Sequence, residues 1–330
     1  MNALEISNLV IKYKTDDGIV SAVNELDLII GKGMTLGLVG ETGAGKTTTA
    51  LSILNLVPNP PGIIESGIIK FEDQNILDLN EKELEKIRGH KISMIFQDPM
   101  TSLNPVLTVE DQIAEVIALH MNLSYKESIV KAREMLEMVD IQADRGVEYP
   151  HQFSGGMKQR VVIAMALACN PSLLIADEPT TALDVTIQAQ VLEMMKSLKK
   201  NYDTSILMIT HDLGIIAEMC DMVAVIYAGR IVEFGNLYDV YENTKHPYTE
   251  GLFNSLPDIK NRNNKLKPIK GLMPDPYNLP NGCPFHPRCE YATDICAKEK
   301  PRRIYANESH YVECHLYNDD NINNGKVINR

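Results

Sequence analysis

The sequence contains a series of short, continuous apolar runs separated by longer segments with helical spacing. Five such runs lie at Thr35–Val39, Ile92–Phe96, Leu173–Ala176, Ser205–Thr210 and Met222–Tyr227. Their apolar residues occupy successive positions instead of alternate ones, which is typical of parallel strands buried on both faces. The pattern therefore predicts a mainly parallel sheet, built from the chain up to about residue 235.

Two of the intervening segments have the 3.6-residue period of amphipathic helices. The first follows Ser124 and Glu127, which have the spacing of a capping box, and the second begins at about Val185. The residues predicted to face the core are Ile129, Ala132, Leu136 and Val139 in the first helix and Ile187, Val191, Met194 and Leu198 in the second. Buried strands that alternate with such helices predict an α/β fold.

Composition and charge exclude some classes of partner. The chain has 330 residues, with 32 Lys+Arg against 44 Asp+Glu and a formal net charge of −12. Such an acidic chain lacks the basic face that a phosphate backbone requires, so nucleic acid is not an expected partner. It has no apolar run of about 18 residues and no basic segment followed by an apolar one at its start. We therefore expect a cytosolic protein without a membrane span.

The first chemical motif follows the run Thr35–Val39. The segment from Gly40 to Thr47 fits the pattern G-x-x-x-x-G-K-[ST], and a helical segment continues from it to just before Pro58. Glycines let backbone N–H groups surround phosphates, Lys46 can reach the β- and γ-phosphates, and the Thr47 hydroxyl can ligate Mg²⁺. The alternative is a flexible glycine-rich turn. A predicted strand before the loop and a predicted helix after it favour the phosphate-binding interpretation over such a turn. The residues expected to bind nucleotide here are Gly40, Glu41, Thr42, Gly43, Ala44, Gly45, Lys46, Thr47 and Thr48.

Two carboxylates follow the apolar run Leu173–Ala176. Asp177 lies at the carboxyl end of this predicted strand, where a nucleotide-bound Mg²⁺ can be held directly or through water. Glu178 follows and can orient or deprotonate an attacking water. A solvated strand end would have the same sequence, so the functional interpretation depends on the phosphate loop.

A second predicted anion site begins at Phe153. The segment Phe153–Arg160 reads FSGGMKQR and precedes an apolar helix. Ser154 near the cap, followed by Gly155 and Gly156, forms a helix N-terminus that favours phosphate. One chain thus offers two phosphate-binding helix ends.

Taken together and in this order, the motifs resemble those of the nucleotide-binding subunits of ABC transporters. Phe153–Arg160 is similar to the family's signature sequence, L-S-G-G-Q, with Phe153 for the leading Leu and Met157 for the Gln. The other matches are Gln97 to the Q-loop glutamine, Ala182–Asp184 to the D-loop, His211 to the switch histidine and Tyr13 to the aromatic residue that stacks on adenine.

The resemblance implies a P-loop ABC ATPase fold in residues 1–256. This fold has a RecA-like core, an antiparallel β subdomain and a helical subdomain at about residues 98–170. It also implies ATP and Mg²⁺ as cofactors, with Glu178, His211 and Gln97 as catalytic residues. The residues implied to ligate Mg²⁺ are Thr47, Gln97 and Asp177, and those implied to act on a partner subunit's nucleotide are Ser154 and Gly156. Gly155 and Asp184 are also implied to bind nucleotide.

Four stretches narrow the resemblance to the oligopeptide and dipeptide importers: residues 97–105, 153–160, 178–186 and 246–249. The resemblance implies an ATPase that powers import of di- or oligopeptides from the cytoplasmic face of the membrane. Its implied partners are a second ATPase subunit, expected to be a paralogue, two membrane permease subunits and an extracytoplasmic solute-binding protein. The loop after Gln97 is expected to touch the permeases.

Three other functions are compatible with parts of this motif set. Related importers carry nickel and other small solutes, and their ATPase subunits would have the same role and the same motifs. A soluble ABC ATPase acting on DNA or ribosomes is disfavoured by the net charge and by the single cassette. A regulatory subunit without hydrolysis is expected to lack Glu178 or His211, and both are present.

Four of the six cysteines crowd into the last fifth of the chain: Cys283, Cys289, Cys296 and Cys314. Their spacing does not match the paired C-x₂-C of zinc ribbons and is better suited to a cubane cluster with four thiolate ligands. The importers that the chain resembles carry such a motif with a [4Fe–4S] cluster. Zinc, with His286 and His315 as spare ligands, and free thiols are the alternatives.

These cysteines lie in a predicted small Cys-rich domain, residues 257–317, which begins with a polar linker, Pro257–Gly271. Residues 318–330 are expected to be a disordered tail. The remaining two cysteines, Cys169 and Cys220, have apolar neighbours and are predicted to be small core residues.

Overall fold

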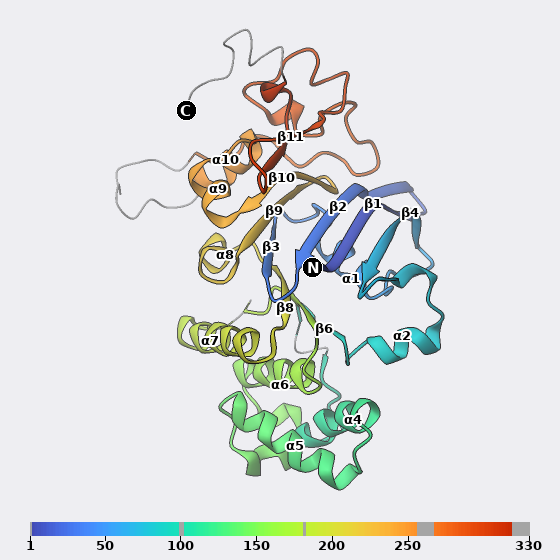
Figure 1. Ribbon diagram of the computed structural model, residues 1–330, viewed down its shortest axis with the longest axis vertical. Coiled ribbons are helices and arrows are strands. Elements are labelled where there is room, and N and C mark those ends of the chain that lie inside the picture. The colour runs from blue at the N-terminus through green and yellow to red at the C-terminus, as the bar shows by residue number, and fades with distance from the viewer. Residues whose placement is uncertain (1, 99–101, 181–182, 256–266, 319–330) are drawn as a thin grey trace.

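The computed structural model describes residues 2–98, 102–180, 183–255 and 267–318 (Figure 1). An eight-stranded sheet runs through the middle of the molecule, in the order β11-β12-β10-β9-β3-β8-β7-β6, and a four-stranded sheet lies beside it in the order β2-β1-β4-β5. The strands of the larger sheet are β11 (Arg303–Tyr305), β12 (Tyr311–Glu313), β10 (Arg230–Asn236), β9 (Met222–Tyr227), β3 (Thr35–Val39), β8 (Ser205–Ile209), β7 (Leu173–Asp177) and β6 (Ile92–Ile95). Those of the smaller sheet are β2 (Gly18–Gly31), β1 (Asn2–Thr15), β4 (Gly62–Phe71) and β5 (Gln74–Asn75).

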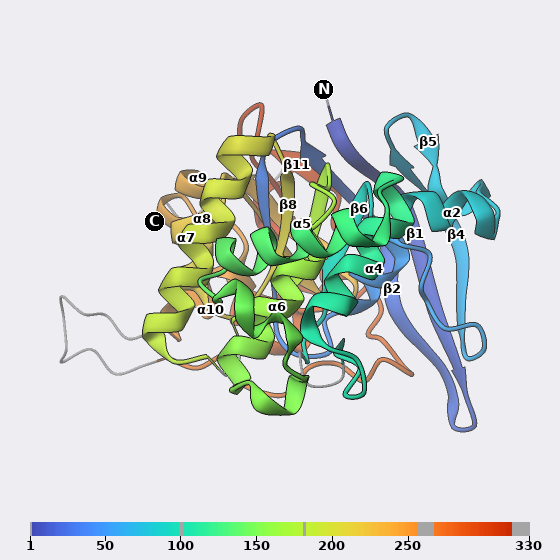
Figure 2. The ribbon, with the colours of Figure 1, turned by 90° about the horizontal axis from the view of Figure 1, so that it is seen from below.

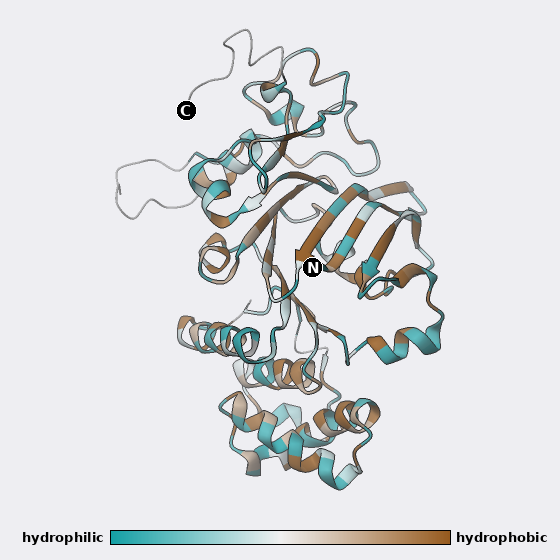
Figure 3. Cartoon of the chain, in the orientation of Figure 1, coloured by the Kyte–Doolittle hydropathy of each residue, from teal (hydrophilic) through white to brown (hydrophobic). Residues whose placement is uncertain are grey.

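The predicted parallel sheet is confirmed. Strands β6, β7, β8, β3 and β9 pair in parallel, and β10, β12 and β11 continue the sheet antiparallel. Each of the five apolar runs forms one of the parallel strands, within one residue of its predicted end. All five residues of β3, β7 and β8 are buried, because helices or the second sheet cover both faces. Figure 3 shows hydrophobic residues concentrated on these strands.

Helices surround the larger sheet and form a separate layer at one end of the molecule. Seen from that end, α4, α5 and α6 lie in front of the sheet (Figure 2). The helices are α1 (Lys46–Ile53), α2 (Glu81–Ile87), α4 (Val109–Met121), α5 (Tyr125–Met138), α6 (Gly155–Leu167), α7 (Val185–Tyr202), α8 (Leu213–Met219), α9 (Leu237–Glu242) and α10 (Pro247–Asn254). Among the described residues, no helix has the length and apolar character needed to cross a bilayer.

The two predicted amphipathic helices are present. The capping box of α5 forms as expected: Ser124 N–H donates to Glu127 Oε2 at 2.8 Å, and Glu127 N–H donates to Ser124 Oγ at 3.4 Å. In α7 the buried face differs from the prediction, because Leu192 and Met195 lie in the core beside Val191, while Ile187 and Met194 are half-buried. The side chain of Leu198 lies outside the described residues.

The expected separate Cys-rich domain is not supported. Strand β12 pairs with β10, with Val312 opposite Glu233, so this part of the chain extends the main sheet. Phe285 is buried in the main core and its ring centroid lies 5.2 Å from that of Tyr227. Without β12, strand β10 would be an edge strand with unpaired backbone N–H and C=O groups. The pairing satisfies these groups, so it favours packing of the C-terminal segment against the main sheet over a separate domain. The predicted linker lies mostly, and the predicted tail almost wholly, outside the described residues.

A buried charge anchors this extension. The Glu233 carboxylate is fully buried and accepts hydrogen bonds from the N–H groups of Lys245 and His246, at 2.7 and 2.9 Å. His310 Nε2, next to β12, lies 2.9 Å from its other side. A buried carboxylate requires such partners, so the segment from α10 to β12 is tied to β10 by polar contacts as well as by packing.

Candidate nucleotide-binding site

The phosphate loop lies between the end of β3 and the start of α1, as predicted. Gly45 precedes α1 with φ at 102°, and a Cβ atom there would lie 2.4 Å from the carbonyl oxygen of Ala22. A Cβ at Gly40 would lie 2.3 Å from the carbonyl oxygen of Ile226. Only glycine fits at these two positions, because the left-handed backbone or the neighbouring carbonyl leaves no room for a side chain.

Lys46 is held inside this loop. Its side chain is buried, and Nζ donates to the carbonyl oxygens of Gly40 at 2.8 Å and Glu41 at 3.0 Å. Burial lowers the pKa of the ammonium, and the charges of the nearby carboxylates act in the opposite direction. The loop thus holds a partly desolvated cation at its centre, which suits the binding of a phosphate.

Two of the three predicted Mg²⁺ ligands meet where the first turn of α1 lies beside the carboxyl end of β7. Thr47 Oγ1 donates to Asp177 Oδ2 at 2.8 Å, and Asp177 is almost fully buried. Burial is the main cause that raises the pKa of Asp177. A desolvated carboxylate beside a hydroxyl is an oxygen donor set that suits Mg²⁺, so these residues fit the ion.

Two of the predicted catalytic residues, Gln97 and His211, contact the carboxylate of the third, Glu178. Glu178 Oε2 accepts a hydrogen bond from Gln97 Nε2 at 3.1 Å, and Glu178 Oε1 lies 3.1 Å from His211 Nδ1. Gln97 follows β6, Glu178 follows β7 and His211 follows β8, so neighbouring parallel strands end at the same edge of the sheet. Glu178 has a positive φ of 49°, and its N–H donates to the carbonyl oxygen of Ile209 at 2.8 Å.

The phosphate loop, Asp177, Glu178 and Gln97 line one cavity of about 360 Å³, whereas His211 contacts Glu178 without lining this cavity itself. Tyr13 lies at its edge, and its hydroxyl donates to Thr48 Oγ1 at 3.4 Å. The lining residues are Tyr13, Val20, Ser21, Ala22, Thr42, Gly43, Gly45, Lys46, Thr47, Thr48, Gln97, Asp177, Glu178 and Pro276. The cavity combines a phosphate loop, a cation site and a carboxylate, which are the parts needed to bind and hydrolyse a nucleoside triphosphate.

The second predicted anion site lies elsewhere on the chain. Ser154 caps α6 by accepting from Met157 N–H at 3.4 Å, and both Ser154 and Gly155 are exposed. Asp184 caps α7 in the same way and is also exposed. None of these residues, nor Gly156, lines the cavity beside the phosphate loop. Ala182, predicted as part of the D-loop, lies outside the described residues.

Sequence reasoning missed three contributors from the C-terminal part of the chain. Tyr248 OH accepts the N–H of Glu41 at 2.8 Å, and Arg288 pairs with the Glu41 carboxylate. Pro276 lines the cavity, and its carbonyl oxygen accepts the N–H of Ser21 at 2.9 Å. Tyr248 belongs to the motif at residues 246–249, and Arg288 precedes a predicted ligand, Cys289, but neither position indicates that it would reach the phosphate loop.

The four C-terminal cysteines line one small cavity together with His246, His286 and His315. Burial raises the pKa of Cys283 to about 11 and that of Cys314 to about 12. Within the ranges that the structure describes, no group of three or more His, Cys, Asp or Glu residues is arranged to hold a metal ion. The expected [4Fe–4S] centre is therefore not confirmed, although its four thiols share one location.

Comparisons with known proteins agree with this geometry. The family model described as ABC transporter matches residues 23–181, and that of the oligopeptide/dipeptide transporter C-terminal region matches residues 232–296. The oligopeptide transport ATP-binding protein AppD of Bacillus subtilis is 50% identical over 96% of this chain and 97% of its own length. The dipeptide transport ATP-binding protein DppD of the same organism is 46% identical over 95% and 94%.

A solved structure shares the fold. It is a dimer of the ATP-binding cassette MJ0796 in a post-hydrolysis state, bound to ADP and Pi. Its chain is 28% identical, covers 71% of the present chain and aligns with a TM-score of 0.65. From the phosphate-loop geometry, the two matched family regions and the near-complete coverage of these relatives, the chain belongs to the ATP-binding proteins of oligopeptide and dipeptide ABC transporters.

Proposed function

We propose that this chain hydrolyses ATP to power the import of dipeptides or oligopeptides through a membrane ABC transporter. The observation that carries the proposal is the placement of Glu178 between Gln97 and His211, beside the phosphate loop. The cargo class follows from the relatives, which are oligopeptide and dipeptide transport proteins, and from the matching C-terminal region.

The residues of the cavity have different roles in the proposed reaction. The N–H groups of the loop and Lys46 bind the phosphates, and Thr47, Asp177 and Gln97 would hold Mg²⁺, which when bound would neutralise charge on the phosphate oxygens. Glu178 orients the attacking water and takes its proton, while Gln97 and His211 hold this carboxylate and sense the γ-phosphate. The products are ADP and phosphate. Tyr13 is the residue proposed to stack on adenine.

A second ATPase subunit completes each site. Ser154, Gly155, Gly156 and Asp184 lie apart from the chain's own phosphate loop, and most of them are exposed. They suit the nucleotide of a partner, which we propose to be a paralogue. Dimer closure would then bring the N-terminus of α6, with its partial positive charge, to the ATP of the partner and allow hydrolysis.

The helical layer is proposed to contact the membrane permeases from the cytoplasmic face. Here a cavity of about 610 Å³ lies along α4, next to Tyr125 at the start of α5, and its lining includes Leu119, which is 74% exposed. The loop after Gln97, proposed as a further contact, includes residues outside those described. An extracytoplasmic solute-binding protein would deliver the cargo, and nucleic acid is not a proposed partner.

Uptake by cells that lack the gene for this chain tests the cargo. Cells with the wild-type chain, with Glu178→Gln and with no chain would be given labelled dipeptide, labelled pentapeptide and Ni²⁺ in parallel. We expect peptide uptake with the wild-type chain alone. Nickel uptake without peptide uptake would refute the peptide assignment while leaving the ATPase assignment intact.

We further propose that Cys283, Cys289, Cys296 and Cys314 hold a [4Fe–4S] cluster. Two observations support this: the four thiols line one cavity, and His246, which also lines it, has a buried Nε2 without a hydrogen-bond partner among the described residues. His246 Nδ1 accepts the N–H of Tyr248 at 3.0 Å, so in the neutral ring Nε2 carries the proton and suits an anionic centre. The cavity itself measures only about 10 Å³, so the thiols must move apart to admit a cluster.

Metal analysis with a visible absorption spectrum tests this assignment on protein purified without oxygen. About four irons per chain with a broad visible band are expected for the cluster. One zinc per chain and no colour would replace it with the zinc alternative, in which His286 and His315 are spare ligands. No metal would leave four free thiols.

A further inference from the structure

We propose that Arg288 is a positioning residue for ATP binding, because it holds and neutralises the Glu41 carboxylate of the phosphate loop. The inference rests on the proposed function only in assuming that this loop binds ATP. It gives the C-terminal segment a role at the nucleotide site that neither matched family description assigns.

The contact between the two residues has the geometry of a strong ion pair. Arg288 Nη1 donates to Glu41 Oε2 at 2.6 Å, and Nη2 donates to Oε1 at 3.0 Å, so each nitrogen pairs with one oxygen of the carboxylate. The Arg288 side chain is only 6% exposed and that of Glu41 28%. Such bidentate, partly desolvated pairs are more directional and stronger than ion pairs on an open surface.

Glu41 is held at all of its polar groups. Its N–H donates to Tyr248 OH, its carbonyl oxygen accepts from Lys46 Nζ, and its carboxylate binds Arg288. Lys46 is the cation at the centre of the loop, so a movement of Glu41 is transmitted to the group that binds phosphate. The orientation of Glu41 therefore bears directly on nucleotide affinity.

Charge gives a second reason for the pair. Glu41 places a carboxylate within a loop whose ligand carries several negative charges, and this carboxylate also influences the ammonium of Lys46. Without a cation beside it, the carboxylate would repel the phosphates of ATP. Arg288 supplies that cation from a segment 247 residues away in sequence.

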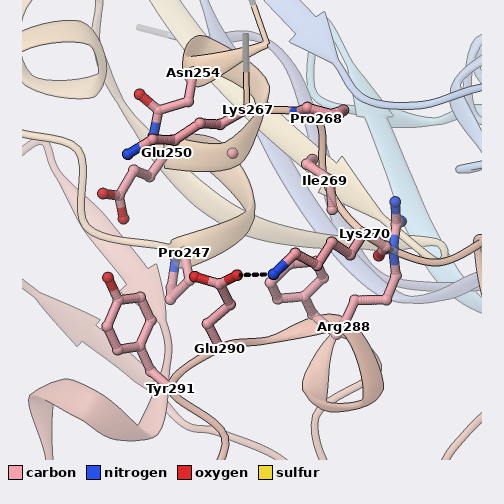
Figure 4. A pocket seen from close by; sticks show the side chains of 12 residues that line it. Pro247, Glu250, Asn254, Lys267, Pro268, Ile269, Lys270, Arg288, Glu290 and Tyr291 are labelled. Carbon is pink, nitrogen blue, oxygen red and sulfur yellow. Dashed lines mark hydrogen bonds and ion pairs between the residues drawn. The ribbon is translucent and has the colours of Figure 1, made fainter. Parts of the chain in front are cut away.

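Contacts with the C-terminal segment and with β9 hold the guanidinium of Arg288 in place. Its Nε donates to the carbonyl oxygen of Lys270 at 3.0 Å, and its guanidinium lies 5.8 Å from the ring centroid of Tyr227. Figure 4 shows Arg288 at the border of a cavity of about 490 Å³, near the ion pair of Lys270 with Glu290. Arg288 is thus pre-oriented, and little side-chain entropy is lost when it binds Glu41.

Binding of a fluorescent ATP analogue to the full chain tests the proposal with four proteins: wild type, Arg288→Gln, Glu41→Gln and the double variant. We expect Arg288→Gln to weaken binding about tenfold, within the usual range of coupling between sites. The double variant should recover most of this loss, because the unpaired carboxylate is gone. The matched control is Glu290→Gln, which breaks the exposed pair in the same segment and should change nothing.

Steady-state kinetics separates positioning from general damage. We expect a raised KM for ATP with kcat unchanged at saturation in Arg288→Gln, since the groups around Glu178 remain in place. Unchanged affinity in Arg288→Gln, or a double variant that binds no better than Arg288→Gln, would overturn the proposal. Absence of ATP binding in the wild type would instead refute the proposed function.

A variant that keeps the charge covers the case in which Arg288→Gln does not fold. Arg288→Lys retains the cation but loses the bidentate geometry. We expect a loss of affinity of about threefold, smaller than in any neutral variant, that is relieved when Glu41→Gln is added. A loss that Glu41→Gln does not relieve would contradict the proposal.

Discussion

At the scale of single residues, the site depends on a few side chains whose environments set their chemistry. Lys46 and Asp177 are buried with opposite charges near the same point, and Glu178 is only partly exposed between two polar partners. Burial removes water that would compete for the phosphates and for the cation. We therefore expect Lys46 and Asp177 to serve nucleotide binding, and Glu178 to serve the hydrolysis step.

The substitution Glu178→Gln tests that division. The variant should retain ATP affinity within about threefold, since Lys46, Thr47 and Asp177 are untouched, and lose hydrolysis by about 10²–10⁴-fold. Phosphate release and analogue binding measure the two effects. Glu193→Gln on the exposed face of α7 is the control and should behave as wild type. Turnover near the wild-type rate would remove Glu178 from its catalytic role.

The substitution Lys46→Ala addresses binding. It removes the buried ammonium that the Gly40 and Glu41 carbonyl oxygens hold, so nucleotide affinity should fall by at least about 100-fold. Isothermal titration with ATP and Mg²⁺ measures the loss. Lys32→Ala, at an exposed position just before β3, should leave affinity unchanged. Equal affinities in the two variants would show that the loop does not bind the phosphates.

At the scale of elements, strand ends bring the site together. The loops after β3, β6, β7 and β8 all begin at one edge of a parallel sheet, and each contributes one chemical group. The C-terminal segment joins them indirectly, because β12 pairs with β10 and Phe285 packs against Tyr227 and Tyr248. Packing of this segment therefore supports the residues that hold Glu41.

The substitution Phe285→Ala measures this support. It leaves a cavity in the main core, so the free energy of unfolding should fall by about 3–5 kcal/mol. Thermal denaturation followed with and without ATP analogue reports both stability and the nucleotide site. The matched control in the same segment is Leu272→Ala, which is 89% exposed and should change stability by less than about 0.5 kcal/mol. A small effect of Phe285→Ala would mean that the segment folds apart from the core.

At the scale of the whole molecule, the two predicted anion sites differ in their exposure to solvent. The phosphate loop lies in a cavity, whereas Ser154 and Gly155 at the start of α6 are open to solvent. This difference in exposure supports the proposal that the chain works with a second subunit. In the proposed assembly, the exposed site would bind the nucleotide of the second subunit.

The substitution Ser154→Arg tests this assembly. A bulky side chain at the cap should block closure over the partner's nucleotide, while binding of ATP by the chain itself stays within about threefold of wild type. Analytical ultracentrifugation with ATP, on Glu178→Gln protein with and without the paralogous subunit, measures closure. Val130→Arg, on the exposed face of α5, is the control. Undiminished dimerisation of Ser154→Arg would exclude the signature segment from the interface.

The sequence by itself determined the features that depend on neighbours along the chain. The strand–loop–helix at Gly40–Thr47, the five apolar strands and the caps at Ser124 and Ser154 were predicted, because periodicity, glycine and capping residues act over a few positions. The predicted catalytic residues were found together at one carboxylate. The buried face of α7 was predicted less well, because its neighbours in space select which residues are covered.

Only the tertiary structure decided which distant segments meet. The contact of Arg288 with Glu41 and the pairing of β12 with β10 join residues far apart in sequence. No local propensity encodes such contacts, since they depend on the burial of apolar surface and the pairing of polar groups across the whole core. For that reason the C-terminal segment, expected to stand alone, became part of the sheet that carries the nucleotide site.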